Sequence, residues 1–136
     1  GLIAATTDQG SGIRWDAGTN INTMAYSDGV GGGRSNTAII IASQGYGDGL
    51  TYSDRVCNEY SVIVGGVTYG DWYLPSKFEL NLLYLQKDTV GGFVSSNYWS
   101  STEASDSNAW GQEFTSGNQD SFGKSDAYGV RAIRAF

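Results

Sequence analysis

The chain has 136 residues, of which 40% are hydrophobic and 16% are charged, and its formal net charge is −6. This length is enough for one domain with a sizeable core, and the single cysteine excludes an intrachain disulfide. The acidic balance argues against a general nucleic-acid binder, which needs a basic surface, and the absence of histidine removes the commonest general base and the usual catalytic zinc ligand.

The first 36 residues combine short strand-like segments with turn-forming residues. Residues 2–6 and 13–15 each have the composition of a short strand. Residues 16–36 are rich in glycine, asparagine, threonine and serine and include the run Gly31-Gly32-Gly33. We therefore expect a long surface loop over residues 16–36.

Two short helices are expected next. Asn36 or Thr37 could cap a helix over residues 38–42 that Gly45 would end. The three consecutive isoleucines of this segment suit a buried strand equally well, and their periodicity does not decide. Residues 51–60 predict a second helix, whose cysteine is expected to be a buried thiol.

A third helix has the clearest local signature. Ser76 and Glu79 have the spacing of a capping box, directly after a segment that stops at a proline. Apolar residues then recur at helical spacing, so we expect the helix to be largely buried. The face expected to be buried consists of Phe78, Leu82 and Leu85, widened by Leu80 and Leu83.

The remaining regular structure is predicted to be mostly strand. Clusters of glycine, serine, asparagine and aspartate separate the strand-like segments at regular intervals. The predicted strands are residues 62–64, 98–101, 109–114, 121–124 and 130–135. Helices followed by an antiparallel sheet indicate an α+β fold, with short helices packed on that sheet.

Several motifs in this order resemble a known bacterial domain family. They are Gly70-Asp71-Trp72-Tyr73-Leu74-Pro75-Ser76-Lys77-Phe78-Glu79-Leu80, Gly91-Gly92-Phe93, Tyr98-Trp99-Ser100-Ser101-Thr102-Glu103, Ala109-Trp110, and the closing Val130-Arg131-Ala132-Ile133-Arg134-Ala135-Phe136. Together they are similar to the family typified by the C-terminal domain of the Legionella collagen-like adhesin. The resemblance is good over residues 70–136 and looser before them.

The resemblance implies a C-type-lectin-like, non-enzymatic module on a secreted or surface protein, and we expect no cofactor. In the adhesin, the domain follows a collagen-like stalk and binds sulfated polysaccharide. We therefore expect residues 1–136 to be one lectin-like domain, the C-terminal part of a longer secreted protein. Its expected partner is a polysaccharide or glycosaminoglycan at the bacterial surface, without nucleic acid or membrane insertion. The alternative is a structural cap that trimerises a fibrous protein, since collagen-like repeats must trimerise.

An acidic protein that binds an anionic glycan must gather its few cations locally. We predict this patch from Lys124, Arg131 and Arg134, with Arg34 in its glycine-rich loop as an independent, mobile contact. Lys124 lies among serine and aspartate residues and is expected to be exposed. Both arginines of the last strand share a face with apolar neighbours, so the alternative is pairing with a buried carboxylate such as Glu79, Glu103 or Asp71.

Aromatic side chains are the other binding resource. Tyr46 and Tyr128 lie near glycines and polar turns and are predicted to be exposed and to contact a sugar. In Trp72-Tyr73 and Tyr98-Trp99, adjacent strand residues point to opposite faces. We therefore expect one member of each pair in the core, while the other could be at the surface.

Metal and catalytic sites have weaker support. Glu103, Asp106 and Asn108 could offer hard oxygens to calcium, as could Asp48, but no EF-hand spacing is present and we favour solvated polar turns. Cys57 has no histidine that could activate it. A carboxylate-dependent hydrolase remains an alternative on principle, although no pair of acids is distinguished by its surroundings. We therefore expect no enzyme and no metal.

Overall fold

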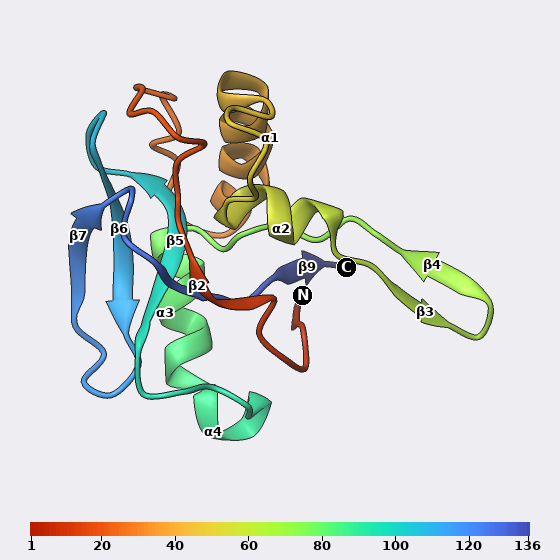
Figure 1. Cartoon of the computed structure of the whole chain (residues 1–136). Helices are drawn as coiled ribbons and strands as arrows, with labels where there is room; N and C mark the ends of the chain where they lie inside the picture. The colour runs from red at the N-terminus through yellow and green to blue at the C-terminus, as the bar shows by residue number, and fades with distance from the viewer.

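The computed structural model describes all 136 residues and contains helices and strands in mixed order (Figure 1). This arrangement confirms the α+β prediction, while the C-type-lectin-like arrangement stays a prediction. The helices are α1 (Gly32–Gln44), α2 (Ser53–Glu59), α3 (Lys77–Leu85) and α4 (Lys87–Val90). The strands are β1 (Leu2–Ala4), β2 (Gly10–Ile13), β3 (Val62–Val64), β4 (Val67–Tyr69), β5 (Asn97–Glu103), β6 (Asn108–Glu113), β7 (Gln119–Gly123), β8 (Tyr128–Val130) and β9 (Ile133–Ala135).

The strands form one main sheet and two small ribbons. The main sheet has the order β2-β8-β5-β6-β7, in which only β5 and β8 run parallel. The predicted strand 130–135 is divided, because β8 ends at Val130 and β9 begins at Ile133. This division lets the chain leave the main sheet and pair β9 with β1, which brings the two termini together. The hairpin of β3 and β4 is a separate ribbon that projects beside the termini (Figure 1).

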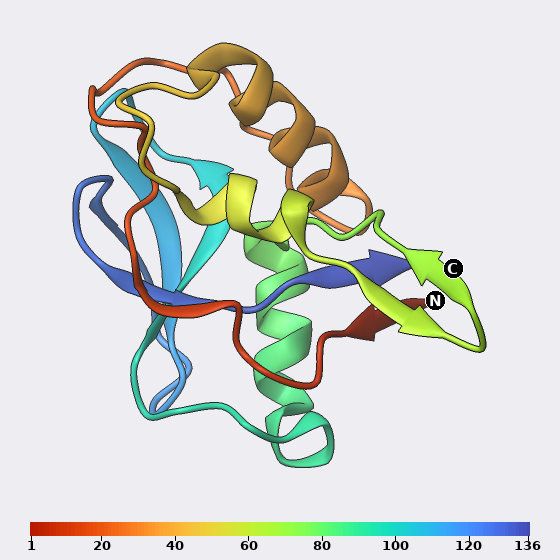
Figure 2. The same cartoon turned by 45° about the vertical axis from the view of Figure 1, so that its right-hand side comes forward.

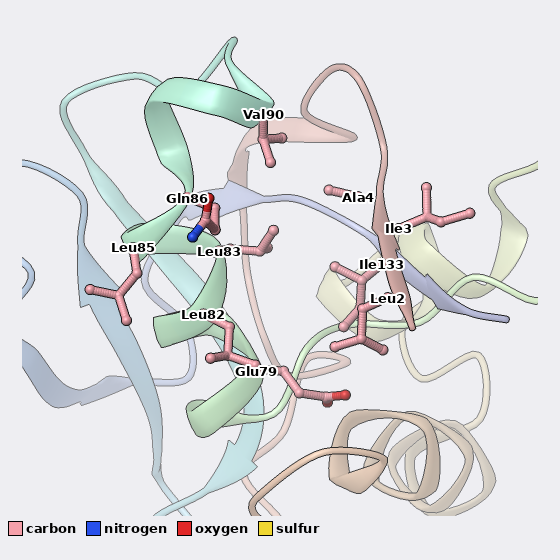
Figure 3. A pocket seen from close by; sticks show the side chains of 10 residues that line it. All are labelled: Leu2, Ile3, Ala4, Glu79, Leu82, Leu83, Leu85, Gln86, Val90 and Ile133. Carbon is pink, nitrogen blue, oxygen red and sulfur yellow. The ribbon is translucent and has the colours of Figure 1, made fainter.

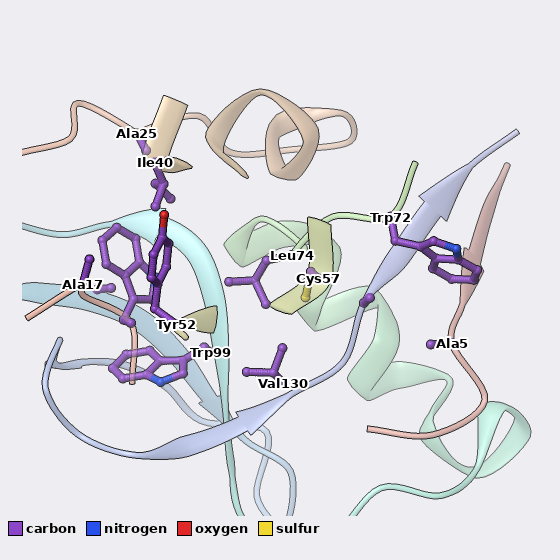
Figure 4. Packing of buried hydrophobic residues seen from close by; sticks show 13 residues of the cluster. Ala5, Ala17, Ala25, Ile40, Tyr52, Cys57, Trp72, Leu74, Trp99 and Val130 are labelled. Carbon is purple, nitrogen blue, oxygen red and sulfur yellow. The ribbon is translucent and has the colours of Figure 1, made fainter. Parts of the chain in front are cut away.

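The hydrophobic core has two parts, one on each face of the main sheet at β5. One cluster contains Trp72 and Trp99, together with Trp15 and Tyr52 (Figure 4). The other contains the neighbours Tyr73 and Tyr98. Adjacent residues therefore point to opposite sides, as expected, but both members of each pair are buried. The suggestion that one member could be at the surface is wrong for both pairs.

Helix α1 is longer than predicted and is not a strand, although it does end before Gly45 as expected. Asn36 and Thr37 are not caps but buried residues within the helix. The glycine run belongs to the helix start because backbone groups approach closely there. A Cβ atom on Gly33 would lie 2.5 Å from the carbonyl oxygen of Leu74, so a larger residue would not fit.

Helix α3 begins with the predicted capping box. The Ser76 hydroxyl accepts from the Glu79 amide at 3.2 Å, and the Glu79 carboxylate accepts from the Ser76 amide at 3.0 Å. The same carboxylate also accepts hydrogen bonds from the amides of Gly31 and Gly33 at the start of α1. These partners satisfy the Glu79 carboxylate, which is buried.

The predicted buried face of α3 is confirmed for Leu80 and Leu83 and wrong for Phe78 and Leu85. Leu80 and Leu83 are buried, whereas Phe78 is 46% exposed and Leu85 is 64% exposed. Leu80 and Leu83 pack in one cluster with residues of the main sheet and β9, whereas Phe78 and Leu85 face outward. An open apolar hollow lies between α3 and β1, and Figure 3 shows Leu83, Leu2 and Ile133 in the space between these two elements. Helix α2 matches its prediction more closely, and its Cys57 is fully buried.

Candidate functional site

Most cations of this chain are held by carboxylates of the same chain. Of the eight lysine and arginine residues, all but Arg34 and Lys77 form ion pairs. The pairs are Arg14–Asp48, Arg55–Glu59, Lys87–Asp88, Lys124–Glu103, Arg131–Asp8 and Arg134–Asp71. A basic patch of Lys124, Arg131 and Arg134 is therefore not assembled, because each of the three is held by a different carboxylate.

Lys124 is 1% exposed, so the prediction that it lies at the surface is wrong. Its ammonium group donates to Glu103 and to the carbonyl oxygens of Ile21 and Asp106, at 2.9 and 2.8 Å. The Glu103 carboxylate also accepts from the amides of Thr23 and Met24. The long loop before α1 thus closes over the end of the main sheet and buries the pair.

Arg131 is also 1% exposed and is held by the N-terminal segment. Its Nε donates to Asp8 Oδ1 at 2.7 Å, and its Nη1 donates to the carbonyl oxygens of Ala5 and Gly91. The guanidinium also lies 4.0 Å from the ring centroid of Phe93. The pairing alternative is therefore confirmed for this residue, although its partner is Asp8 rather than one of the acids considered from the sequence.

Arg134 and Arg34 lie on one side of the molecule. Arg134 pairs with Asp71 and stacks 4.7 Å from the ring centroid of Tyr69. The hydrogen bond from Arg134 lowers the pKa of Asp71, and the charge of the nearby Arg34 lowers it further. Arg34 is exposed in the first turn of α1, the helix at the top of Figure 2, rather than in a mobile loop.

An apolar groove adjoins Arg134, between β1 and the β3–β4 hairpin. Its volume is about 340 Å³. We call it the hairpin groove, and its lining consists of Ile3, Ala4, Ala5, Thr6, Tyr60, Val62, Val64, Tyr69, Trp72 and Arg134. The rings of Tyr60 and Trp72 meet edge to face at 5.1 Å, and the Trp72 indole donates to the Tyr69 carbonyl oxygen at 3.0 Å. These contacts fix the orientation of the aromatic wall.

The two tyrosines predicted to contact a sugar lie outside this groove. Tyr46 is 74% exposed, as predicted, and carries the guanidinium of Arg55 at 4.7 Å from its ring centroid. Tyr128 is half-buried, with its ring centroid 4.9 Å from that of Trp99 and 5.0 Å from that of Phe122. Its expected exposure is wrong, because it packs at the edge of the core.

Two of the three carboxylates considered as calcium ligands are held by cations of the chain. Glu103 is bound to Lys124, and Asp48 is bound to Arg14, whose hydrogen bond lowers the pKa of Asp48 to about 2. No group of three or more histidine, cysteine, aspartate or glutamate side chains is placed to hold a metal ion. The burial of Cys57 raises its pKa well above the ordinary value, so the thiol is not an activated nucleophile.

Comparison with known proteins agrees with the motifs found in the sequence. Residues 4–134 match a family model described as the Lcl C-terminal domain. The match extends over almost the whole chain, including the N-terminal part in which the motifs are looser. No curated protein matches the sequence. None of the four helices has the length and apolar character needed to cross a membrane.

Proposed function

Because the chain belongs to the Lcl C-terminal domain family, we propose that it is an adhesin-type module that binds sulfated polysaccharide at the bacterial surface. The family is one of C-terminal domains of collagen-like proteins, not of enzymes. We assign the binding surface to the hairpin groove together with Arg34 and Arg134. The observation that carries this assignment is the position of Arg134 in the lining of an aromatic groove, with Arg34 near enough for its charge to act on the same carboxylate, Asp71.

The local charge favours an anionic ligand on this surface. The charges of Arg134 and Arg34 both act on the carboxylate of Asp71, so this surface holds cations that an anionic group can approach, although the whole chain is acidic. Guanidinium groups bind the oxygens of sulfate and carboxylate groups through paired hydrogen bonds. Tyr69 adds a ring against which a sugar can pack while Arg134 stays in place.

Replacing Arg34 with alanine should weaken binding to heparin by about fivefold, because one exposed charge-assisted hydrogen bond is lost. The thermal unfolding midpoint should stay unchanged, since Arg34 is exposed and has no ion pair. Binding of the unmodified chain should also weaken steeply with added salt. Isothermal titration calorimetry at two salt concentrations, with a thermal melt of each variant, measures both effects.

Lys87→Ala is the matched control for this experiment. Lys87 is a partly exposed cation on α4, paired only loosely with Asp88 at 3.7 Å. This variant should bind heparin as the unmodified chain does. Equal losses in both variants would show that binding reflects total charge, and the absence of heparin binding at low salt would contradict the proposal.

A second candidate function is the assembly of a trimer, which the exposed hairpin favours. Ile63, Val64 and Val67 are 73%, 64% and 52% exposed. Nearby, the terminal residue Phe136 is 76% exposed. A two-stranded ribbon with this much exposed apolar surface gains stability when another chain covers it.

Replacing Ile63 with lysine should convert a trimer into monomers if the hairpin forms the interface. Ile63 pairs with Thr68 and points away from the groove face of Val62, Val64 and Tyr69, so the groove should be preserved. Multi-angle light scattering over a range of concentrations measures the change. Val94→Lys, on an exposed loop before β5, is the control. A monomeric unmodified chain at high concentration would remove this function and leave glycan binding untouched.

A further inference from the structure

A third hollow lies at the end of the main sheet where β5 begins and β6 ends. Its volume is about 510 Å³. We call it the polar hollow, and its lining is Ser95, Ser96, Asn97, Glu113, Asn118, Asp120 and Phe122. It shares no residue with the hairpin groove and contains no cation.

The strand register explains how these side chains meet. Asn97 of β5 pairs with Glu113 of β6, and Asp120 of β7 pairs with Gly111 of β6. Paired residues share a face of a sheet, so the polar groups of three neighbouring strands point to the same side. Phe122 lies on that side too, two residues after Asp120.

Gly111 lies beneath the ring of Phe122, which is one of the lining residues. Because Gly111 has no side chain, this ring can lie directly against the backbone of β6. A Cβ atom on Gly111 would lie 3.0 Å from Cδ2 of Phe122 and 2.9 Å from the carbonyl oxygen of Tyr98. The ring of Phe122 therefore comes close to the backbone of β6, and its packing against Tyr128 at 5.0 Å between centroids holds it there.

The opposite face of the same strands is covered by α3. Gln112 donates to the Asn81 side chain at 2.9 Å, and the ammonium group of Lys77 lies 3.7 Å from the ring centroid of Trp110. Four of the seven lining residues thus lie on strands of a sheet that α3 supports from the other face, while Ser95, Ser96 and Asn118 lie in the adjoining connections. Binding groups on rigid elements lose little entropy when a ligand arrives.

The chemistry of the lining selects the kind of ligand. Carboxylate, amide and hydroxyl groups predominate, which disfavours an apolar ligand, and the two carboxylates repel sulfate. Sugar hydroxyls can donate to the carboxylates and accept from the amides, while the C–H face of the ring packs on Phe122. The Glu113 carboxylate is already oriented by hydrogen bonds from Thr115 and Ser116. We propose that the polar hollow binds a neutral saccharide.

This site goes beyond the proposed binding of sulfated glycans, because it differs from the hairpin groove in place, charge and ligand.

The test of the polar hollow is titration of the ¹⁵N-labelled chain with maltotriose, cellotriose and mannotriose, followed by NMR. At least one of these sugars should shift the amides of residues 95–97, 111–113 and 118–122. Asp120→Ala should weaken that binding by about tenfold, since hydrogen bonds to an exposed carboxylate are lost.

Controls separate this site from the hairpin groove. Asp88→Ala removes an exposed carboxylate on α4 and should leave sugar binding unchanged, and so should Arg34→Ala. Heparin binding should in turn be unaffected by Asp120→Ala. The inference is overturned if none of the three sugars shifts these amides. It is also overturned if Asp120→Ala and Glu113→Gln, both folded by thermal melt, bind the sugar as tightly as the unmodified chain.

Discussion

Replacing Lys124 with alanine should destabilise the domain by about 3–5 kcal/mol, because it leaves the Glu103 carboxylate charged and buried without its partner. Two carbonyl oxygens, of Ile21 and Asp106, would lose their donor at the same time. If Lys124 were exposed, as predicted from the sequence, the same substitution would instead weaken glycan binding and leave the stability of the domain unchanged. Urea unfolding followed by tryptophan fluorescence measures the change.

The double variant Lys124→Met with Glu103→Gln is the informative comparison. It removes both charges at similar side-chain volume and should recover much of the stability lost in Lys124→Ala. Lys87→Ala, which removes a surface cation, should change the free energy of unfolding by less than about 0.5 kcal/mol. If Lys124→Ala also changes the free energy of unfolding by less than about 0.5 kcal/mol, the buried pair does not stabilise this end of the sheet.

Replacing Asp54 with asparagine should stabilise the domain increasingly as the pH rises. Burial raises the pKa of Asp54 to about 8, although hydrogen bonds from Ser53 and Thr37 act in the opposite direction. The unfolded chain releases this proton near pH 3.9, the ordinary value for aspartate. The folded state therefore binds more protons between about pH 4 and pH 8, and the contribution of Asp54 to stability declines across that window, by up to about 1.4 kcal/mol per pH unit.

The measurement is the free energy of unfolding of Asp54→Asn and of the unmodified chain at several pH values. The difference between them should grow from pH 4 to pH 8 and then level off. Asp48→Asn is the matched control, because the pKa of Asp48 is lowered to about 2 by Arg14. Its stabilising contribution is lost only as the pH falls below about 4, so its difference should be flat above pH 5. A flat difference for Asp54→Asn as well would contradict its burial as a neutral acid.

Local signals in the sequence predicted local structure well. The capping box at Ser76 and the helix end at Gly45 depend on contacts within a few residues, and both are confirmed. The start of α1 was missed for a tertiary reason. Glu79, far along the chain, accepts from Gly31 and Gly33, and this contact converts an apparent glycine loop into the beginning of a helix.

Charge partners could not be predicted, because they are distant in sequence. Lys124 lies among polar residues, which suggests exposure, but the loop before α1 folds back and buries it with Glu103. Arg131 pairs with Asp8, which is 123 residues away. No local pattern in the sequence specifies such a pair. The alternation of the last strand placed Arg131 among apolar neighbours, which indicated that it needs a carboxylate partner but not which one.

The candidate site was predicted in part. Arg34 and Arg134 were both chosen from the sequence, yet only the fold shows that their charges act on the same carboxylate, Asp71. The aromatic wall of Tyr60 and Trp72 was missed, because each residue looked like core within its own segment. The polar hollow was missed as well, since it depends on the register of three strands around Gly111.

Binding of sulfated glycan to the hairpin groove beside Arg34 and Arg134 is tested most directly by NMR mapping. A heparin-derived tetrasaccharide should be titrated into the ¹⁵N-labelled chain at low salt. The largest amide shifts are predicted at Arg34, Tyr69 and Arg134, with none around the buried Lys124. Shifts centred on Lys77 or Lys87, or no shifts at all, would show that the hairpin groove is not the binding site for sulfated glycan.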